Sequence, residues 1–213
     1  MPQPEHSPQD LHERELVERA KAGDAAAWTE LLSSYQHRLF TVCLRMVGDR
    51  ELAADLTQDA LVKLIENIGA YDGRSRLSTW LIRITMNLCL SKLRAEKHRR
   101  HAPLETGISD QDPSSRGGRE RGELGHARTP RGIDYAEPGE GPGVERVSER
   151  SRVSRALLEV SEEHRAILVL RDVRGLDYDQ IAAVLGVPEG TVKSRLFRAR
   201  AALREAFERL AED

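Results

Sequence analysis

Apolar residues recur along most of the chain at the three- and four-residue steps of an α-helix, and no segment alternates as a β-strand would. A first helix is predicted over about 11–21, where Gly23 then interrupts the pattern and Asp24 is placed to cap the next helix. That next helix is long, and Gly48 with Asp49 ends it and starts a third. The apolar face of the long helix comprises Trp28, Leu31, Leu32, Tyr35, Leu39, Val42 and Met46.

The third predicted helix directs one set of apolar residues inward: Leu52, Leu56, Leu61, Leu64, Ile65 and Ile68. Residues 69–77 are expected to form a loop, because glycine and polar residues replace the helical pattern there. Ser78 or Thr79 then caps a fourth helix, which runs to about Lys97.

Composition changes sharply after His101. Residues 102–146 are rich in Gly, Pro, Ser, Arg and Glu, and cannot bury enough surface to offset the entropy of ordering them. We expect a linker there, with a root-mean-square reach of about 40 Å. Helical patterning then resumes at about 147–159, 162–173, 178–185 and 189–210. The predicted fold is all-α, with a disordered tail at 1–10, one helical domain at 11–101, the linker at 102–146 and a second helical domain at 147–213.

Composition favours two modest helical cores over one large core. Of the 213 residues, 39% are apolar and only 4% are aromatic, so Leu, Ile, Val and Ala have to build the cores. Charged residues reach 32% while the net charge is −2, so charge has to be considered as local patches. Cys43 and Cys89 form no C-x-x-C pair and are expected to be buried thiols.

The N-terminus has no apolar signal core. No segment approaches the about 20 apolar residues of a membrane span. We therefore expect a soluble cytoplasmic protein that does not enter a membrane.

The segment 178–198 has the spacing of a helix-turn-helix. Gly186 ends its first helix, Val187 packs at the turn, and Pro188 suits the start of the second helix. At about 100° per residue, the second helix has an apolar arc made of Val192, Leu196, Ala199, Leu203, Ala206, Phe207 and Leu210. The residues outside that arc are Thr191, Lys193, Ser194, Arg195, Phe197, Arg198, Arg200 and Arg204.

Phe197 is the informative residue of this second helix, because it lies among cations rather than on the apolar arc. An exposed aromatic ring can contact a thymine methyl in the major groove, while Arg and Lys reach guanine edges and phosphates. The pattern favours DNA reading over an ordinary helical hairpin with a solvated basic face. Taken alone, it indicates only a DNA-binding module.

The helix after Ser78 carries a narrow polar strip within an arc of about 80°. The strip comprises Trp80, Arg83, Asn87, Ser91, Arg94 and His98, and apolar residues cover most of the remaining circumference. An aromatic ring, an amide and cations suit the stacking, hydrogen bonding and phosphate neutralisation that single-stranded DNA requires. The alternative is a tryptophan in the core beside a solvated strip. The basic segment 92–101 extends the positive surface.

The preceding helix is acidic, through Glu51, Asp55, Asp59 and Glu66, with Gln58 beside them. Such a surface should avoid DNA and suits a basic protein partner. From the pattern alone, a merely solvated face is the better explanation.

These features together resemble the extracytoplasmic-function (ECF) group of bacterial RNA polymerase sigma factors. Residues 54–64 (ADLTQDALVKL) are similar to the family's polymerase-binding helix, and residues 71–87 (YDGRSRLSTWLIRITMN) to its promoter-melting and −10 element. Residues 175–200 are similar to its −35-binding helix-turn-helix. The resemblance implies a region-2-like domain and a region-4-like domain in a factor that binds core polymerase, recognises promoter elements and promotes melting and initiation.

The resemblance also implies which residues make the contacts. The basic coiled coil of the polymerase clamp would be met by Asp55, Leu56, Gln58 and Asp59. The −10 element, with a flipped base, would be handled by Gly73, Arg74, Ser75, Arg76, Leu77, Trp80, Arg83, Asn87 and Arg94. The −35 major groove would be read by Thr191, Lys193, Ser194, Arg195, Phe197 and Arg198. An anti-sigma factor is expected as a further partner, and neither a small-molecule substrate nor a cofactor is implied.

Two features depart from the family pattern. The linker is longer and richer in Gly, Pro and Arg than that of a minimal member, and Arg74 with Arg76 leaves the −10 base preference open. One alternative function is a stand-alone helix-turn-helix regulator that binds a palindrome as a dimer without polymerase. The other alternative is an enzyme such as a nuclease. The sequence argues against it, because it contains no metal-ligand cluster, phosphate-binding loop or set of nucleophile residues.

Overall fold

The computed structural model describes residues 8–101 and 144–212. Within these two ranges the chain is helical and contains no strand, so the predicted all-α class is confirmed. The elements are α1 (Pro8–Lys21), α2 (Ala25–Val47), α3 (Arg50–Asn67), the 3-10 turn η1 (Ile68–Ala70), α4 (Leu77–His101), α5 (Val144–Glu159), α6 (Glu162–Leu168), the π-turn η2 (Val169–Val173), α7 (Tyr178–Leu185) and α8 (Glu189–Glu212). Most of the predicted linker lies outside the described residues.

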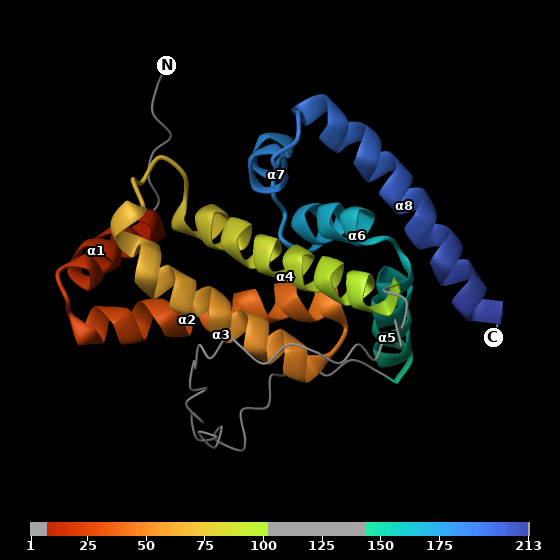
Figure 1. Cartoon of the computed structure of the whole chain (residues 1–213), viewed down its shortest axis with the longest axis horizontal. Coiled ribbons are helices and arrows are strands. Elements are labelled where there is room, and N and C mark those ends of the chain that lie inside the picture. Colours follow the sequence, from red (N-terminus) through yellow and green to blue (C-terminus); the bar gives the residue numbers. More distant parts are fainter. Residues whose placement is uncertain (1–7, 102–143, 213) are drawn as a thin grey trace, which may run out of the picture.

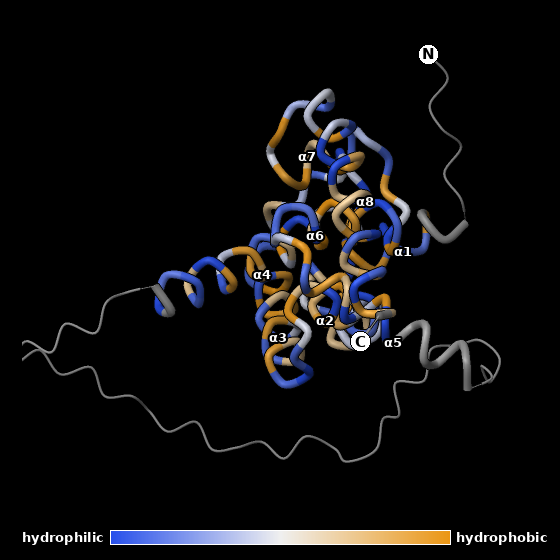
Figure 2. Tube along the Cα trace, turned by 90° about the vertical axis from the view of Figure 1, so that its right-hand side faces the viewer, coloured by the Kyte–Doolittle hydropathy of each residue, from blue (hydrophilic) through white to orange (hydrophobic). Residues whose placement is uncertain are grey.

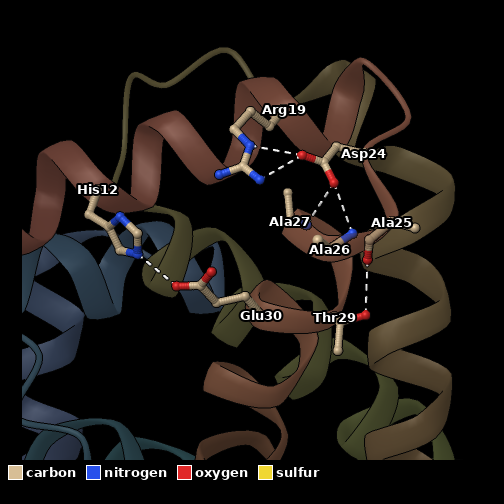
Figure 3. A network of polar contacts seen from close by, with 8 residues as sticks. All are labelled: His12, Arg19, Asp24, Ala25, Ala26, Ala27, Thr29 and Glu30. Carbon is tan, nitrogen blue, oxygen red and sulfur yellow. Dashed lines mark hydrogen bonds and ion pairs between the residues drawn. The ribbon is translucent and has the colours of Figure 1, made fainter.

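Helices α1 to α4 form the N-terminal domain, in which α2, α3 and α4 pack against one another and α1 covers one end of α2 (Figure 1). Residue Asp24 caps α2, as predicted, by accepting hydrogen bonds from the backbone nitrogens of Ala26 at 2.8 Å and Ala27 at 3.2 Å. The same carboxylate accepts from Arg19 at 2.6 and 2.9 Å, which lowers the pKa of Asp24 and ties α1 to the start of α2 (Figure 3).

The boundary between α2 and α3 follows the expected residues. Gly48 ends α2 in the left-handed conformation with φ +76°, where glycine is favoured. Asp49 then caps α3 by accepting a hydrogen bond from the backbone nitrogen of Leu52 at 2.7 Å.

Helices α5 to α8 form the C-terminal domain. The turn between α7 and α8 has the predicted helix-turn-helix geometry: Gly186 adopts φ +66° and Val187 packs against the core. A capping box between Asp177 and Gln180 fixes the first residue of α7. Helix α8 runs the full length of this domain and covers α5 and α6.

Apolar side chains gather in two clusters. One lies inside the N-terminal domain at the α1 end and includes Leu31, Leu64 and Leu81. The other runs without interruption from the N-terminal domain into the C-terminal domain, so that buried Met46 and Ile167 belong to one core. Figure 2 shows hydrophobic and hydrophilic residues alternating along the helices of both domains.

Four local expectations are corrected by the structure. Helix α4 already begins at Leu77, so Ser78 and Thr79 lie in its first turn and do not cap it. The side chain of Ile65 is 48% exposed, because α3 turns it away from α2 and α4. The helix predicted over 162–173 has these bounds, but its last part, from Val169, is a π-helix. Helix α1 starts at Pro8, so the last residues of the predicted tail are helical.

No helix in the described part of the chain is long and apolar enough to span a membrane.

Candidate nucleic-acid interface

The outward face of α8 presents the predicted −35-reading residues. Lys193, Ser194 and Arg198 are exposed. Phe197 is 78% exposed, the highest value among the large hydrophobic residues that the structure describes as exposed. The opposite face is sequestered, since Val192, Leu196, Ala199 and Ala206 are all buried. Packing therefore fixes the rotation of α8 and leaves its aromatic and basic residues directed at solvent.

Two members of the predicted −35 set are less accessible than the others. Arg195 is half-buried, and its Nη1 lies 3.5 Å from Oε2 of Glu163 on α6. Thr191 is half-buried in the first turn of α8, where its backbone nitrogen donates to the carbonyl of Pro188 at 2.9 Å. Arg195 thus connects α8 to α6, while the bond of Thr191 lies within the start of α8 itself.

The polar strip of α4 is exposed as predicted. Its residues Arg83, Asn87, Ser91, Arg94 and His98 all face solvent. Trp80 is an exception, because it is half-buried and its ring packs on Tyr71 with the centroids 5.6 Å apart and the planes tilted by 50°. The Trp80 side chain is thus partly accessible to solvent, and its contact with Tyr71 supports the preceding loop.

That loop, residues 71–76, has a defined shape. The hydroxyl of Tyr71 donates to the carbonyl of Ser75 at 2.6 Å. The carboxylate of Asp72 accepts from the backbone nitrogen of Arg74 at 3.0 Å. Gly73 adopts φ +73°, a left-handed conformation that favours glycine. These bonds hold Arg74, whose side chain is 90% exposed, at the tip of the loop.

Leu77 does not belong to the exposed part of the loop, contrary to its assignment among the −10 residues. It is fully buried in the N-terminal core, because α4 begins at this residue and turns it toward α2. In this conformation Leu77 anchors the loop, and its side chain is enclosed by the core.

Helix α3 presents Asp55, Gln58 and Asp59 on one exposed face, as predicted. Leu56 differs from these three residues, since it is only 5% exposed and packs into the core. A pocket of about 320 Å³ lies along this face, between α3 and Lys92 of α4.

Sequence reasoning missed the apolar part of the α3 face. Val62 is 45% exposed and Ile65 is 48% exposed, and the helical positions of Val62 and Glu66 fall within about 20° of that of Asp55. The face is therefore mixed, with carboxylates alternating with aliphatic side chains. Such a combination is typical of protein interfaces rather than of purely solvated surfaces.

Comparison with known proteins places these faces in a family. The Sigma-70 region 2 profile matches residues 31–99, and the Sigma-70 region 4 profile matches residues 150–203. The RNA polymerase sigma-H factor of Pseudomonas aeruginosa is 32% identical over 201 residues, which is 94% of this chain and 96% of that protein. The chain belongs to the sigma factors of bacterial RNA polymerase.

A second relative narrows that membership to one group. The ECF RNA polymerase sigma-E factor of Escherichia coli K12 is 30% identical over 195 residues, covering 92% of this chain and 94% of that protein, and it places the chain among the ECF sigma factors. The solved structure of the sigma factor RpoE from Bartonella quintana, in complex with the anti-sigma factor NepR, has the same fold. It matches with a TM-score of 0.59 at 23% identity over 84% of this chain and 96% of that one.

This ECF sigma factor is thus a transcription initiation factor that binds core RNA polymerase and promoter DNA. Its region-2 domain carries α3 and the α4 strip, and its region-4 domain carries the reading face of α8. Among the residues that the structure describes, no group of His, Cys, Asp and Glu side chains is arranged to hold a metal ion.

The two cysteines of this sigma factor are buried free thiols, as expected, with their sulfur atoms 3.8 Å apart. Their contact lowers the pKa of Cys43 and raises that of Cys89. Neither thiol contributes to any of the three exposed faces, so their role in this conformation is to fill the core.

Proposed function

We propose that this ECF sigma factor divides its work among three separate faces. The mixed face of α3, with Asp55, Gln58 and Asp59, binds the basic coiled coil of the polymerase clamp. The loop from Gly73 to Arg76 and the strip of α4 bind the opened −10 element. The outward face of α8 reads the −35 element in the major groove. The factor acts in the cytoplasm and supports initiation without catalysing a reaction of its own.

The observation that carries the α8 assignment is the exposure of Phe197 between Lys193 and Arg198. An aromatic side chain that is 78% exposed on an otherwise well-packed helix gains nothing from the fold. Contact with a base edge or a thymine methyl accounts for it. The cations on either side supply phosphate and guanine contacts at the same depth of the groove.

The −35 assignment is tested by Lys193→Ala and Arg198→Ala, measured with a duplex that carries the −35 element and with a scrambled duplex. Loss of a base contact should weaken the binding free energy for the duplex with the −35 element by about 1–3 kcal/mol. Loss of a phosphate contact should weaken both duplexes equally. Arg204→Ala is the matched control, since Arg204 is exposed on the same helix beyond the turn. The assignment is wrong if both variants behave as Arg204→Ala does.

The polymerase assignment is tested by the double reversal Asp55→Lys and Asp59→Lys. Both side chains are exposed, so helicity and thermal unfolding should be unchanged while binding to core polymerase is lost. Glu205→Lys with Glu208→Lys reverses the same amount of charge on exposed α8 positions and should leave binding intact. Retained polymerase binding by the α3 variant would disprove the role of this face.

A gel shift separates this function from that of a stand-alone regulator. The sigma factor should shift promoter DNA strongly only when core polymerase is present, whereas a dimeric regulator would shift a palindromic duplex by itself. The Bartonella quintana sigma factor was solved with an anti-sigma factor bound. We propose a partner of that kind here too.

A further inference from the structure

The last turn of α1 lies against the start of the loop 71–76, far away in the sequence. Helix α1 contacts η1, which leads directly into that loop (Figure 1). A cation at the end of α1 makes a polar contact there. Nζ of Lys21 donates to the backbone carbonyl of Tyr71 at 3.2 Å and lies 6.0 Å from the centre of the Tyr71 ring. A lysine in a last helical turn is common, because the helix dipole favours it, but the dipole requires no partner on another element.

The side chain of Lys21 is held toward this loop. Its Nζ also pairs with Oε1 of Glu18, 2.9 Å away and one turn earlier on α1. Lys63 on α3 offers a comparison, since it pairs with Glu66 at the same spacing and the same distance. The side chain of Lys63 is 50% exposed, whereas that of Lys21 is 26% exposed. A surface lysine normally keeps its ammonium in water. The lower exposure of Lys21 therefore reflects its contact with Tyr71.

Tyr71 carries the contact from α1 into the loop. Its backbone nitrogen donates to the carbonyl of Ile68 at 3.1 Å, so both backbone polar groups of this residue are bonded. Its side chain is buried and its ring packs on Trp80. Its hydroxyl donates to the carbonyl of Ser75 at 2.6 Å. One residue thus holds the loop at both ends, through its backbone at the start and through its hydroxyl near the finish.

The part of the loop between these two attachments is exposed. Residues 72–76 all face solvent. The hydrogen bond and the ion pair described for Asp72 and Arg74 join these two residues to each other and not to the core. An exposed segment with few buried contacts is easily displaced, while recognition needs side chains placed to within about 0.5 Å. A shift of Tyr71 would therefore move Arg74 at the loop tip.

We propose that Lys21 is a positioning residue for recognition of the −10 element. From α1 it fixes the backbone of Tyr71, and through Tyr71 it sets the shape of the loop that receives an unpaired base. Its charge also lies beside the Tyr71 ring, and connected hydrogen bonds strengthen one another. Lys21 acts through Tyr71 and not by touching DNA. The inference rests on the proposed role of the loop in binding the opened −10 element.

The test uses full-length sigma factor assembled with core polymerase, and fork-junction DNA whose single-stranded −10 segment is randomised. Sequencing of the DNA before and after capture gives the base preference at each position. Lys21→Met removes the ammonium but keeps a long side chain. It should reduce the strongest base preference in the single-stranded segment by about two- to tenfold, the range that one hydrogen bond controls. Lys21→Arg should restore the preference, because a guanidinium can donate to the same carbonyl and lie over the same ring.

Two further variants of α1 are matched controls. Arg19→Met removes one positive charge from the same helix, where the guanidinium pairs with Asp24 and not with the loop. Glu18→Gln removes the ion pair of Lys21 but leaves its bond to the carbonyl of Tyr71. Both variants should keep the native base preferences. Circular dichroism of each variant establishes that its helices remain folded.

A second substitution tests whether Lys21 acts through Tyr71. Tyr71→Phe removes the hydroxyl that donates to Ser75 and keeps the ring that packs on Trp80. It should reduce the same base preference as Lys21→Met does. The double variant should lose little more than the larger single loss, because both changes act on one set of contacts. Fully additive losses would show two independent effects and overturn the inference.

The outcomes separate this inference from the proposed function. Equal weakening on every sequence, with unchanged base preferences, would make Lys21 a phosphate contact and overturn the inference. A loss of preference that Arg19→Met shares, or that Lys21→Arg does not restore, overturns it as well. Arg74→Ala changes the loop tip itself. If Arg74→Ala alters the base preferences and Lys21→Met does not, only the positioning role fails. If neither variant alters them, the proposed role of the loop in binding the −10 element fails.

Discussion

The buried guanidinium of Arg165 gives the most direct test of how the C-terminal domain is held together. Arg165→Met retains most of the side-chain volume but removes every donor. The carbonyls of Leu157, Val160 and Met46 would then lie in an apolar environment without their partner. Burial already lowers the pKa of Arg165, with Glu162 acting in the opposite direction, so the charge is tolerated only because these carbonyls solvate it.

The loss in free energy of unfolding can be estimated from the hydrogen bonds that Arg165→Met removes. A hydrogen bond to a charged group contributes about 1.5–3 kcal/mol net, and an unsatisfied buried acceptor costs about 1–3 kcal/mol. The variant also regains the desolvation cost of the guanidinium, which offsets part of that loss. The carbonyl of Leu158 is only partly buried, so water can replace its bond. We expect Arg165→Met to lower the free energy of unfolding by about 3–5 kcal/mol, a large share of the about 5–15 kcal/mol of a typical domain.

Urea unfolding followed by circular dichroism measures this free energy. Arg209→Met is the control, since Arg209 pairs with Glu159 at 3.1 Å while its side chain is 62% exposed, and such surface pairs contribute less than about 1 kcal/mol. Arg165→Lys should recover only part of the loss, because an ammonium cannot match the planar fork of a guanidinium. If Arg165→Met is no more destabilised than Arg209→Met, the guanidinium does not hold the helix ends and the reasoning fails.

Three further outcomes are expected. The pKa of Asp24 is lowered by Arg19, so its contribution to stability is present above the unfolded value of about 3.9 and is lost as pH falls through the folded pKa. Asp24→Asn keeps a capping side chain but should flatten the pH dependence of unfolding below about pH 4, and an unchanged acid profile would contradict this. Tyr35→Phe removes the hydroxyl that donates to Glu13 and should cost about 0.5–1.5 kcal/mol in urea unfolding, with no loss indicating that this α1–α2 bond is dispensable. Phe197→Ala should change the free energy of unfolding by less than about 0.5 kcal/mol, because the residue is 78% exposed, but it should weaken binding to the duplex with the −35 element. A large loss of stability would show instead that the ring supports the fold.

The sequence predicts this fold well because its local signals agree with its packing. Asp24, Gly48, Asp49 and Gly186 mark helix ends by backbone chemistry alone, and each one acts at the predicted place. The errors arise where one helix meets several neighbours. Ile65 fits an inward pattern on a helical wheel, but α3 is covered by α2 and α4 on one side only, so that side chain faces solvent.

The candidate site is predicted in part for the same reason. Periodicity separates the exposed face of α8 from its buried face, since both lie on one long and regular helix. It cannot separate Leu56 and Leu77 from the polar residues beside them in a family motif. Their burial depends on contacts between helices. The buried contact of Arg165 with the carbonyl of Met46 cannot be predicted from periodicity at all, because in the sequence Arg165 has the appearance of a surface cation.

Arg165 divides its hydrogen bonds unevenly between the two domains. One bond, to the carbonyl of Met46, crosses to the N-terminal domain, while the carbonyls of Leu157, Leu158 and Val160 belong to the C-terminal domain. Arg174 is a second buried cation, and its environment disfavours the charge. Burial and the nearby charge of Arg38 lower its pKa, and its buried Nε finds no hydrogen-bond partner among the described residues. The two domains are thus joined chiefly by a shared apolar core, and buried cations contribute less to the contact because most bonds of Arg165 lie within one domain and Nε of Arg174 has no partner among the described residues.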